Sequence, residues 1–236
     1  MKKLWSRCVY VFIVVVSMGL VFTGCNMSVN KSIHIRDGET VDHGPTTVNG
    51  SITIGNNCKV MGSATTVNGS IKVGENSRVR SLKTVNMGIK VGKNTVVEGS
   101  ITTVNGSITC YEGVTVDRDI STVNGSINCH KGVKVEDDIS NVNGDFTLTT
   151  AIVKGDISTN TGDITLRDKS MVEGDITIRR TRSLTRRHRT LDIKISGDSV
   201  VKGDIIVKDD DLKVKIFLSA GGKVEGTVVN AEVVNQ

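Results

Sequence analysis

Five aspartates recur at nearly regular spacing and are the side chains best suited to chemistry in this sequence. Their spacings are 19, 18, 19 and 29 residues. Carboxylates in such a row can accept hydrogen bonds from turn amides, hold a Ca²⁺ ion between them, or act as acid and base in hydrolysis. Stacked like charges repel one another, so a bare row is unfavourable. The row consists of Asp119, Asp138, Asp156, Asp175 and Asp204.

A second chemical feature is a cationic segment at 179–189, which holds six arginines, one histidine and no acidic residue. Guanidinium groups bind phosphates and carboxylates through paired hydrogen bonds, so an anionic lipid or an acidic glycan is the expected partner. A solvated loop insertion is the alternative. Nucleic acid is not expected, because no aromatic residues for base stacking accompany the cations. The arginines are Arg179, Arg180, Arg182, Arg186, Arg187 and Arg189.

Histidines and cysteines do not form a recognisable catalytic centre. The four histidines stand far apart, without partners at the spacing of a metal site or a catalytic triad. Cys110 and Cys129 are 19 residues apart, which predicts equivalent positions in adjacent units, either as buried thiols or as a disulfide. We therefore expect no enzyme activity and no cofactor. The histidines are His34, His43, His130 and His188.

The N-terminal segment has the pattern of an export signal. Three cations precede an apolar stretch at 9–22, and small residues lead to Cys25. The segment resembles a bacterial lipoprotein signal peptide, which implies that residues 1–24 are removed and that Cys25 is lipidated. A transmembrane anchor is the alternative, although the stretch is short for a span. By the same resemblance, Asn26 favours the outer membrane, or the cell surface in a host with one membrane.

Composition indicates a thin, elongated fold. Removal of residues 1–24 leaves 27 cations and 25 anions, so the remaining net charge is +2 and says little about partners. Aromatic residues make up only 3% of the chain, too few for a conventional core. Small branched side chains must therefore form the core in another way.

A repeat of 19 residues, occasionally 18, supplies that core and predicts the fold. Copies of Thr-Val-Asn-Gly-Ser-Ile mark the units, and the apolar residue that ends each copy serves as an anchor. In all ten units the second residue after the anchor is also apolar, as in a strand with one buried face. The anchors are Ile33, Ile52, Ile71, Ile89, Ile108, Ile127, Phe146, Ile164, Ile193 and Ile216.

Two further apolar positions complete each unit. Valine stands eight residues after the anchor, or seven in one unit, and a third apolar position follows about four residues later, with Pro45 as the exception. Three apolar segments separated by turns describe a triangular coil, which is stable only when coils stack. The uneven spacing favours a right-handed path. We predict an all-β, single-domain, right-handed parallel β-helix of about ten coils at 25–236, with a basic loop insertion near 179–189.

One corner of the coil carries seven asparagines, each followed by glycine or methionine, or in the first copy by lysine. Their spacing predicts a column of side-chain amides that hydrogen-bond from coil to coil. We expect the glycine after the asparagine to supply the positive φ of an Asn-Gly turn. The column consists of Asn30, Asn49, Asn68, Asn86, Asn105, Asn124 and Asn143.

The Gly-Asp-Ile and Val-Asn-Gly-Ser-Ile coils at about 28–230 resemble those of the bactofilins and of related envelope β-solenoids. Bactofilins are polymer-forming cytoskeletal proteins of bacteria with a right-handed triangular β-helix. The resemblance implies a non-enzymatic protein that assembles through the ends of the helix.

Together these observations predict a lipid-anchored structural or interaction protein of the bacterial envelope. The C-terminal segment 227–236 has four valines, one charge and no proline, so it is expected either to pair with another copy or to fold over the last coil as a cap. A surface adhesin or a protein that binds glycan or anionic lipid is the alternative. A polysaccharide-active enzyme, built on the aspartate row, is a third possibility.

Overall fold

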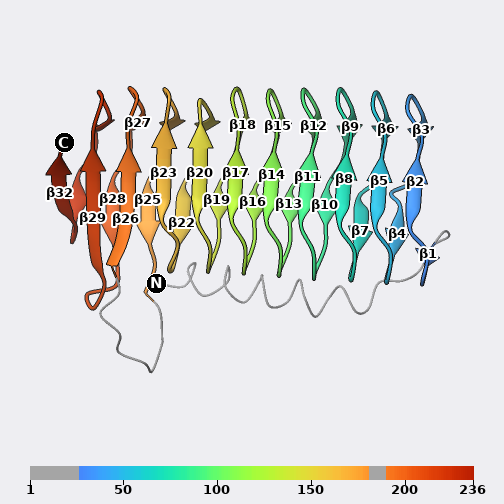
Figure 1. Ribbon diagram of the computed structural model, residues 1–236, viewed down its shortest axis with the longest axis horizontal. Helices are drawn as coiled ribbons and strands as arrows, with labels where there is room; N and C mark the ends of the chain where they lie inside the picture. The colour runs from blue at the N-terminus through green and yellow to red at the C-terminus, as the bar shows by residue number, and fades with distance from the viewer. Residues whose placement is uncertain (1–26, 181–189) are drawn as a thin grey trace.

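The computed structural model describes residues 27–180 and 190–236, which form one parallel β-solenoid without a helix (Figure 1). Each full coil contributes one strand to each of three sheets, and every pairing within these residues is parallel. In Figure 1 the front strands run upward, the chain returns behind them and each new coil lies to the left, which is a right-handed path. The predicted all-β, right-handed triangular solenoid is confirmed.

The sheets are called A, B and C. Sheet A contains β1 (Met27–Ser28), β4 (Thr46–Thr47), β7 (Ala64–Thr66), β10 (Leu82–Lys83), β13 (Ile101–Thr102), β16 (Ile120–Ser121), β19 (Ile139–Ser140), β22 (Ile157–Thr159), β25 (Ile176–Ile178), β28 (Ile205–Val207) and β31 (Val228–Val229). Sheet B contains β2 (Ile33–Ile35), β5 (Ile52–Ile54), β8 (Ile71–Val73), β11 (Ile89–Val91), β14 (Ile108–Cys110), β17 (Ile127–Cys129), β20 (Phe146–Thr149), β23 (Ile164–Arg167), β26 (Thr190–Ile195), β29 (Lys213–Leu218) and β32 (Glu232–Asn235). Sheet C contains β3 (Thr40–Val41), β6 (Lys59–Val60), β9 (Arg78–Val79), β12 (Val96–Val97), β15 (Thr115–Val116), β18 (Lys134–Val135), β21 (Ile152–Val153), β24 (Met171–Val172), β27 (Val200–Val201) and β30 (Lys223–Val224).

The core is a set of aliphatic columns that run along the rod. The anchor residues pair directly from coil to coil, for example Ile108 with Ile127 and Ile127 with Phe146. The valines of sheet C and the isoleucines of sheet A pair in the same way, and most of these side chains are fully buried. All three apolar positions predicted from the repeat therefore point inward. Stacking lets each short strand bury its side chains against two neighbours, which one coil could not do.

Threonines of the Thr-Val-Asn-Gly copies also lie inside the solenoid. Each hydroxyl donates a hydrogen bond to a backbone carbonyl of the preceding coil, as from Thr66 to Gly50 at 2.8 Å and from Thr122 to Gly106 at 3.0 Å. Such bonds satisfy polar groups that would otherwise be buried without partners. The motif thus builds the corner and does not form an exposed reactive site.

The asparagine column forms as predicted, whereas the reason given for the adjacent glycines is wrong. The side-chain amides join in a chain, as from Asn68 to Asn49 at 2.7 Å and from Asn124 to Asn105 at 2.9 Å. In these turns Gly144 has a positive φ, but Gly69 does not. A Cβ on Gly69 would lie 1.9 Å from the carbonyl oxygen of Gly50. Glycine is required here by the close approach of successive coils.

The chain departs from the 19-residue period twice near its C-terminal end. One extra segment follows β25 and a shorter one precedes β29, and in each case the next strand of sheet B is six residues long. The added pairing places Leu191 beside Val214, and both side chains are buried. β31 completes the tenth coil and β32 begins an eleventh in parallel register, so the C-terminal segment extends the solenoid and does not fold back over it.

Candidate functional site

The aspartate row lies along the corner that precedes sheet A, and its carboxylates cap the turns. Each carboxylate accepts a hydrogen bond from the backbone N–H of the equivalent residue in the next coil. Asp204 extends the pattern to Thr227 at 2.7 Å. Among the described residues, no group of three or more His, Cys, Asp or Glu side chains could hold a metal ion. The N···O distances are 3.3 Å for Asp138 to Asp119, 2.9 Å for Asp156 to Asp138, 2.9 Å for Asp175 to Asp156 and 2.8 Å for Asp204 to Asp175.

A second carboxylate row, not anticipated from the sequence, occupies the corner before sheet B. The N–H of Asp163 donates to Asp145 at 3.0 Å, and the N–H of Asp192 donates to Asp163 at 3.0 Å. Earlier coils have serine at this position, as when the N–H of Ser70 donates to Ser51 at 3.3 Å. The same change from serine to aspartate occurs in the first row. The second row could have been found by aligning the residue before each anchor, since that position changes from serine to aspartate midway along the chain.

Two of the six predicted arginines lie within the described residues. The backbone N–H of Arg179 donates to Thr159 at 2.7 Å, so Arg179 still follows the path of the coil. The carbonyl oxygen of Arg180 accepts a hydrogen bond from the Asn160 side chain at 3.3 Å, and Arg180 is exposed. The first two residues of the cationic segment therefore directly follow β25 of sheet A. Arg182, Arg186, Arg187 and Arg189 lie outside the described residues.

The lipidation site predicted at Cys25 also lies outside the described residues, as does His188. The described chain begins at Met27, the first residue of β1, so Cys25 precedes the first strand of sheet A by two residues. Within the described part of the chain, no helix is long and apolar enough to cross a membrane.

Cys110 and Cys129 occupy paired positions in β14 and β17, as the 19-residue spacing predicted. Both are free thiols buried in the core. The hydrogen bond with Cys129, together with burial, raises the pKa of Cys110 well above its ordinary value. A protonated, buried thiol is a poor nucleophile, so this pair acts as core packing.

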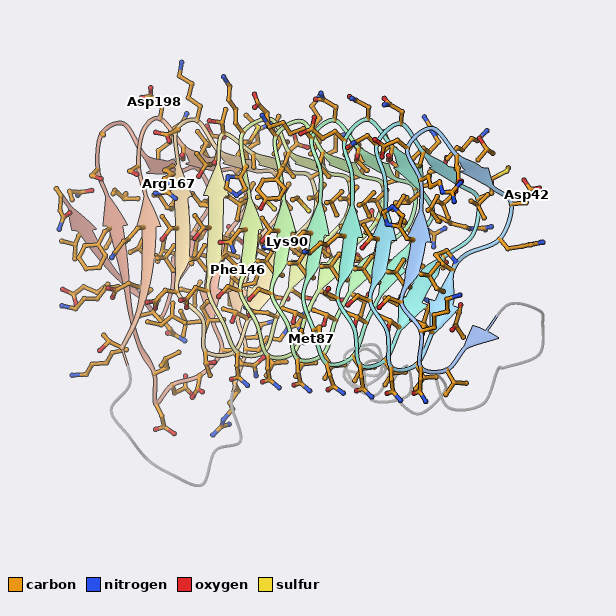
Figure 2. All side chains as sticks on the ribbon, turned by 45° about the vertical axis from the view of Figure 1, so that its right-hand side comes forward. Asp42, Met87, Lys90, Phe146, Arg167 and Asp198 are labelled. Atoms are coloured by element: carbon orange, nitrogen blue, oxygen red, sulfur yellow. The ribbon has the colours of Figure 1, made fainter. Side chains whose placement is uncertain are left out.

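Tyr111 and His130 form an exposed aromatic pair where sheet B meets the next corner. Their rings stack with centroids 5.3 Å apart and an interplanar angle of 21°. The two following coils place Thr149 and Arg167 at the equivalent position, and the Arg167 Nε donates to the Thr149 hydroxyl at 2.9 Å. Arg167 and Lys90 lie on the same side of the rod in Figure 2. An aromatic surface beside a guanidinium group is suited to a sugar ring that carries a negative charge.

The outward face of sheet C carries most of the ion pairs among the described residues. Arg78 pairs with Glu98 at 2.7 Å and Lys202 pairs with Glu173 at 3.4 Å. A hydrogen bond to Glu136 raises the pKa of Lys154. These side chains are exposed, so each pair contributes little to stability and mainly keeps the face solvated.

The two ends of the rod expose strand edges and core side chains. At the C-terminal end, Val233 continues the anchor column yet is 43% exposed. At the other end Ile33, the first anchor, is partly exposed. Pro45 is buried and occupies the position that Ala64 has in the next coil. Comparison with known proteins adds no functional assignment, because no family model, curated protein or solved structure matches the chain.

Proposed function

We propose that this chain is a lipid-anchored, non-enzymatic structural protein of the bacterial envelope that assembles through the ends of its β-solenoid, as the resemblance to bactofilins suggests. The observation that carries the proposal is the open C-terminal end. There β30, β31 and β32 each have one unpaired edge, and Val233 leaves the aliphatic column uncovered. An unblocked edge of parallel strands is a template for a further chain.

The two ends differ in how well they can pair. The N-terminal edge of sheet A is formed by β1, two residues after Cys25, and Pro45 lies one strand inside this edge. A lipid on Cys25 would hold this end at the membrane. The free C-terminal end is therefore the better contact, and the first product of assembly is a C-terminal to C-terminal dimer.

Sedimentation tests this contact directly. The chain from residue 25, with Cys25→Ser to remove the acyl chain, should form dimers whose proportion rises with concentration. Val233→Lys should remove the end-to-end contact and so lower the proportion of dimer, while leaving the β-sheet circular dichroism unchanged. Thr115→Lys, a change of the same type on the outward face of sheet C, is the matched control and should leave the dimers intact. A wild type that stays monomeric at every accessible concentration would reject end-to-end assembly.

Lipid attachment is tested separately in cells. Labelling with a palmitate analogue should mark the full-length chain and not the Cys25→Ser variant. The transmembrane alternative predicts instead an uncleaved chain of full mass that is unlabelled in both forms. Cell fractionation of the labelled protein then distinguishes an outer-membrane location from an inner-membrane one.

A second candidate function, binding of an acidic envelope glycan, is favoured by the Tyr111–His130 stack, which Thr149 and Arg167 continue in the next two coils. Tyr111→Ala and Arg167→Gln should each lower retention of the protein on an acidic polysaccharide column. Added salt should likewise lower the retention of the wild type. Met61→Ala, which removes another exposed apolar side chain, is the control. Equal retention of all four proteins would reject this function.

A further inference from the structure

The outward face of sheet A has almost no charge. Its central column consists of hydroxyl residues interrupted by Lys83, which is the one charged residue at the outward positions from β4 to β22. We call this column the hydroxyl column. It consists of Thr46, Thr65, Thr102, Ser121, Ser140 and Thr177, whereas Ser158, at the same register, is buried.

Beside the hydroxyl column runs a column of outward-facing valines, here called the valine ladder. Their carbonyl oxygens accept hydrogen bonds from the next coil, from a backbone N–H as when Asn68 donates to Val48 at 2.8 Å, or at Val142 from the Thr161 hydroxyl at 3.0 Å, so the valines stack directly. None of them belongs to the buried core, and Val29 is 51% exposed. The ladder consists of Val29, Val48, Val67, Val85, Val104, Val123 and Val142.

Folding does not explain this face. The inward side chains of sheet A already fill the core, and any polar residue that favours β-strands would be compatible with the outward positions. A flat, apolar and nearly uncharged surface is costly to leave in water, and depletion of charge marks the centre of protein interfaces. Sheets packed face to face lie about 10 Å apart with interlocking side chains, which small residues such as Val, Thr and Ser allow.

We propose that the outward face of sheet A binds the same face of a second copy of this chain, with the two rods antiparallel and centred on β13. This inference deepens the proposed self-assembly by adding a lateral contact to the end contact. An overlap of nine strands, about five residues wide, covers about 700 Å² per copy at ordinary strand spacings. The total of about 1,400 Å² is the size of a stable protein interface.

Charge distribution selects the antiparallel arrangement. The aspartate row borders sheet A on the side away from the valine ladder, and it begins only at Asp119; the equivalent earlier residues are serines such as Ser81. In a parallel two-fold pair, the aspartates of one copy would face the valines of the other, which buries carboxylates against apolar groups. In the antiparallel pair the valine ladders face each other, and Asp119 lies opposite Ser81 and near Lys83.

Cross-linking of the full-length chain in intact bacteria tests both the face and the direction. Thr102→Cys lies at the centre of the proposed contact, so a bismaleimide about 10 Å long should join two copies. Thr115→Cys, on the outward face of sheet C, is the matched control and should give at least five-fold less dimer. The native chain, in which Cys58, Cys110 and Cys129 are buried, gives the background.

Direction is tested by co-expressing two differently tagged variants, Thr65→Cys and Ser140→Cys. The antiparallel pair predicts cross-links between them, because β7 and β19 lie two strands on either side of β13. Predominant cross-links from Thr65→Cys to itself would overturn the antiparallel arrangement. Equal dimer from Thr102→Cys and Thr115→Cys would overturn the choice of face.

A lipid surface is the competing occupant. Protection of Thr102→Cys from a water-soluble maleimide by the membrane, without cross-linked dimer, would assign the face to lipid and overturn the proposal. Adding Val233→Lys to Thr102→Cys separates the two contacts. Cross-linking at Thr102→Cys should persist in that double variant even where assembly through the ends is lost, and its disappearance would overturn an independent lateral contact.

Discussion

Sheets A and C of the solenoid are alike inside and opposite outside. Both present an unbroken column of buried aliphatic side chains to the core, such as Ile120 in sheet A and Val116 in sheet C. Outside, sheet C carries ion pairs such as that of Arg78 with Glu98, whereas sheet A carries hydroxyl groups and the valine ladder. The difference teaches that two sheets with the same inward pattern need not have the same outward face. The outward positions are free to differ, and we attribute the contrast between the two outward faces to different functions.

The largest expected effect tests the part that the two sheets share. Ile120→Ala in sheet A should lower the free energy of unfolding by about 3 kcal/mol, and Val116→Ala in sheet C by about 2 kcal/mol, because each leaves a cavity in a fully buried column. Urea unfolding measures both. A much smaller loss of unfolding free energy for Ile120→Ala than for Val116→Ala would show that the two sheets do not contribute equally to the core.

A smaller effect is expected from the buried threonines that follow the strands of sheet A. Thr122→Val keeps the shape of the side chain but removes the hydrogen bond to the Gly106 carbonyl. The loss should cost about 1–2 kcal/mol. Thr115→Val, at an outward position of sheet C, is the control and should change stability by less than about 0.5 kcal/mol. Equal values for the two variants would show that the buried hydroxyl contributes nothing.

The outward faces should respond differently to one added charge, with little change in stability. Ser121→Lys in sheet A and Thr115→Lys in sheet C should each shift the free energy of unfolding by less than about 0.5 kcal/mol. Only Ser121→Lys should reduce lateral dimer, by ten-fold or more, because it places a second cation opposite Lys83 within a nearly uncharged interface. Analytical sedimentation of both variants decides, and an equal loss of dimer would remove the functional contrast between the sheets.

The smallest expected effect concerns the ion pairs of sheet C. A hydrogen bond from Lys223 lowers the pKa of Glu225. Because the pKa is lower in the folded state than in the unfolded chain, the pair stabilises the fold above the unfolded pKa of about 4.3, and this stabilisation is lost as pH falls through the folded value. Glu225→Gln should therefore be slightly less stable than the wild type at pH 7 and indistinguishable at low pH. A difference that grows on acidification would contradict this assignment.

Much of the fold could be predicted because positions that are buried in the solenoid are occupied by apolar residues at regular spacing in the sequence. Anchor residues such as Ile108 and Ile127 are apolar in every unit, so their spacing gives the coil, the register and the three sheets. The asparagine column and the turn hydrogen bonds of the aspartate row follow from the same register. The second carboxylate row, at Asp145, Asp163 and Asp192, was missed although it obeys the same rule.

Other features could not be read from residue type. Val104 points outward and Val97 points inward, yet both are valines, and only the strand register separates them. Gly69 was assigned a positive φ because Asn-Gly commonly forms such turns, but the spacing between coils decides its role. Ion pairs of sheet C such as Arg78 with Glu98 join side chains from neighbouring coils, so they depend on rotamers that a repeat pattern does not specify.

The hydrogen bonds between coils run along the axis of the rod, which gives the molecule a mechanical character. A force that pulls the two ends apart loads these bonds in the direction of their length. The end coils pair with only one neighbour, so they should detach first. Such a rod would uncoil from its end one turn at a time. Each turn of about 19 residues would release about 60 Å of chain, so a tethered rod can lengthen several-fold while the remaining coils stay folded.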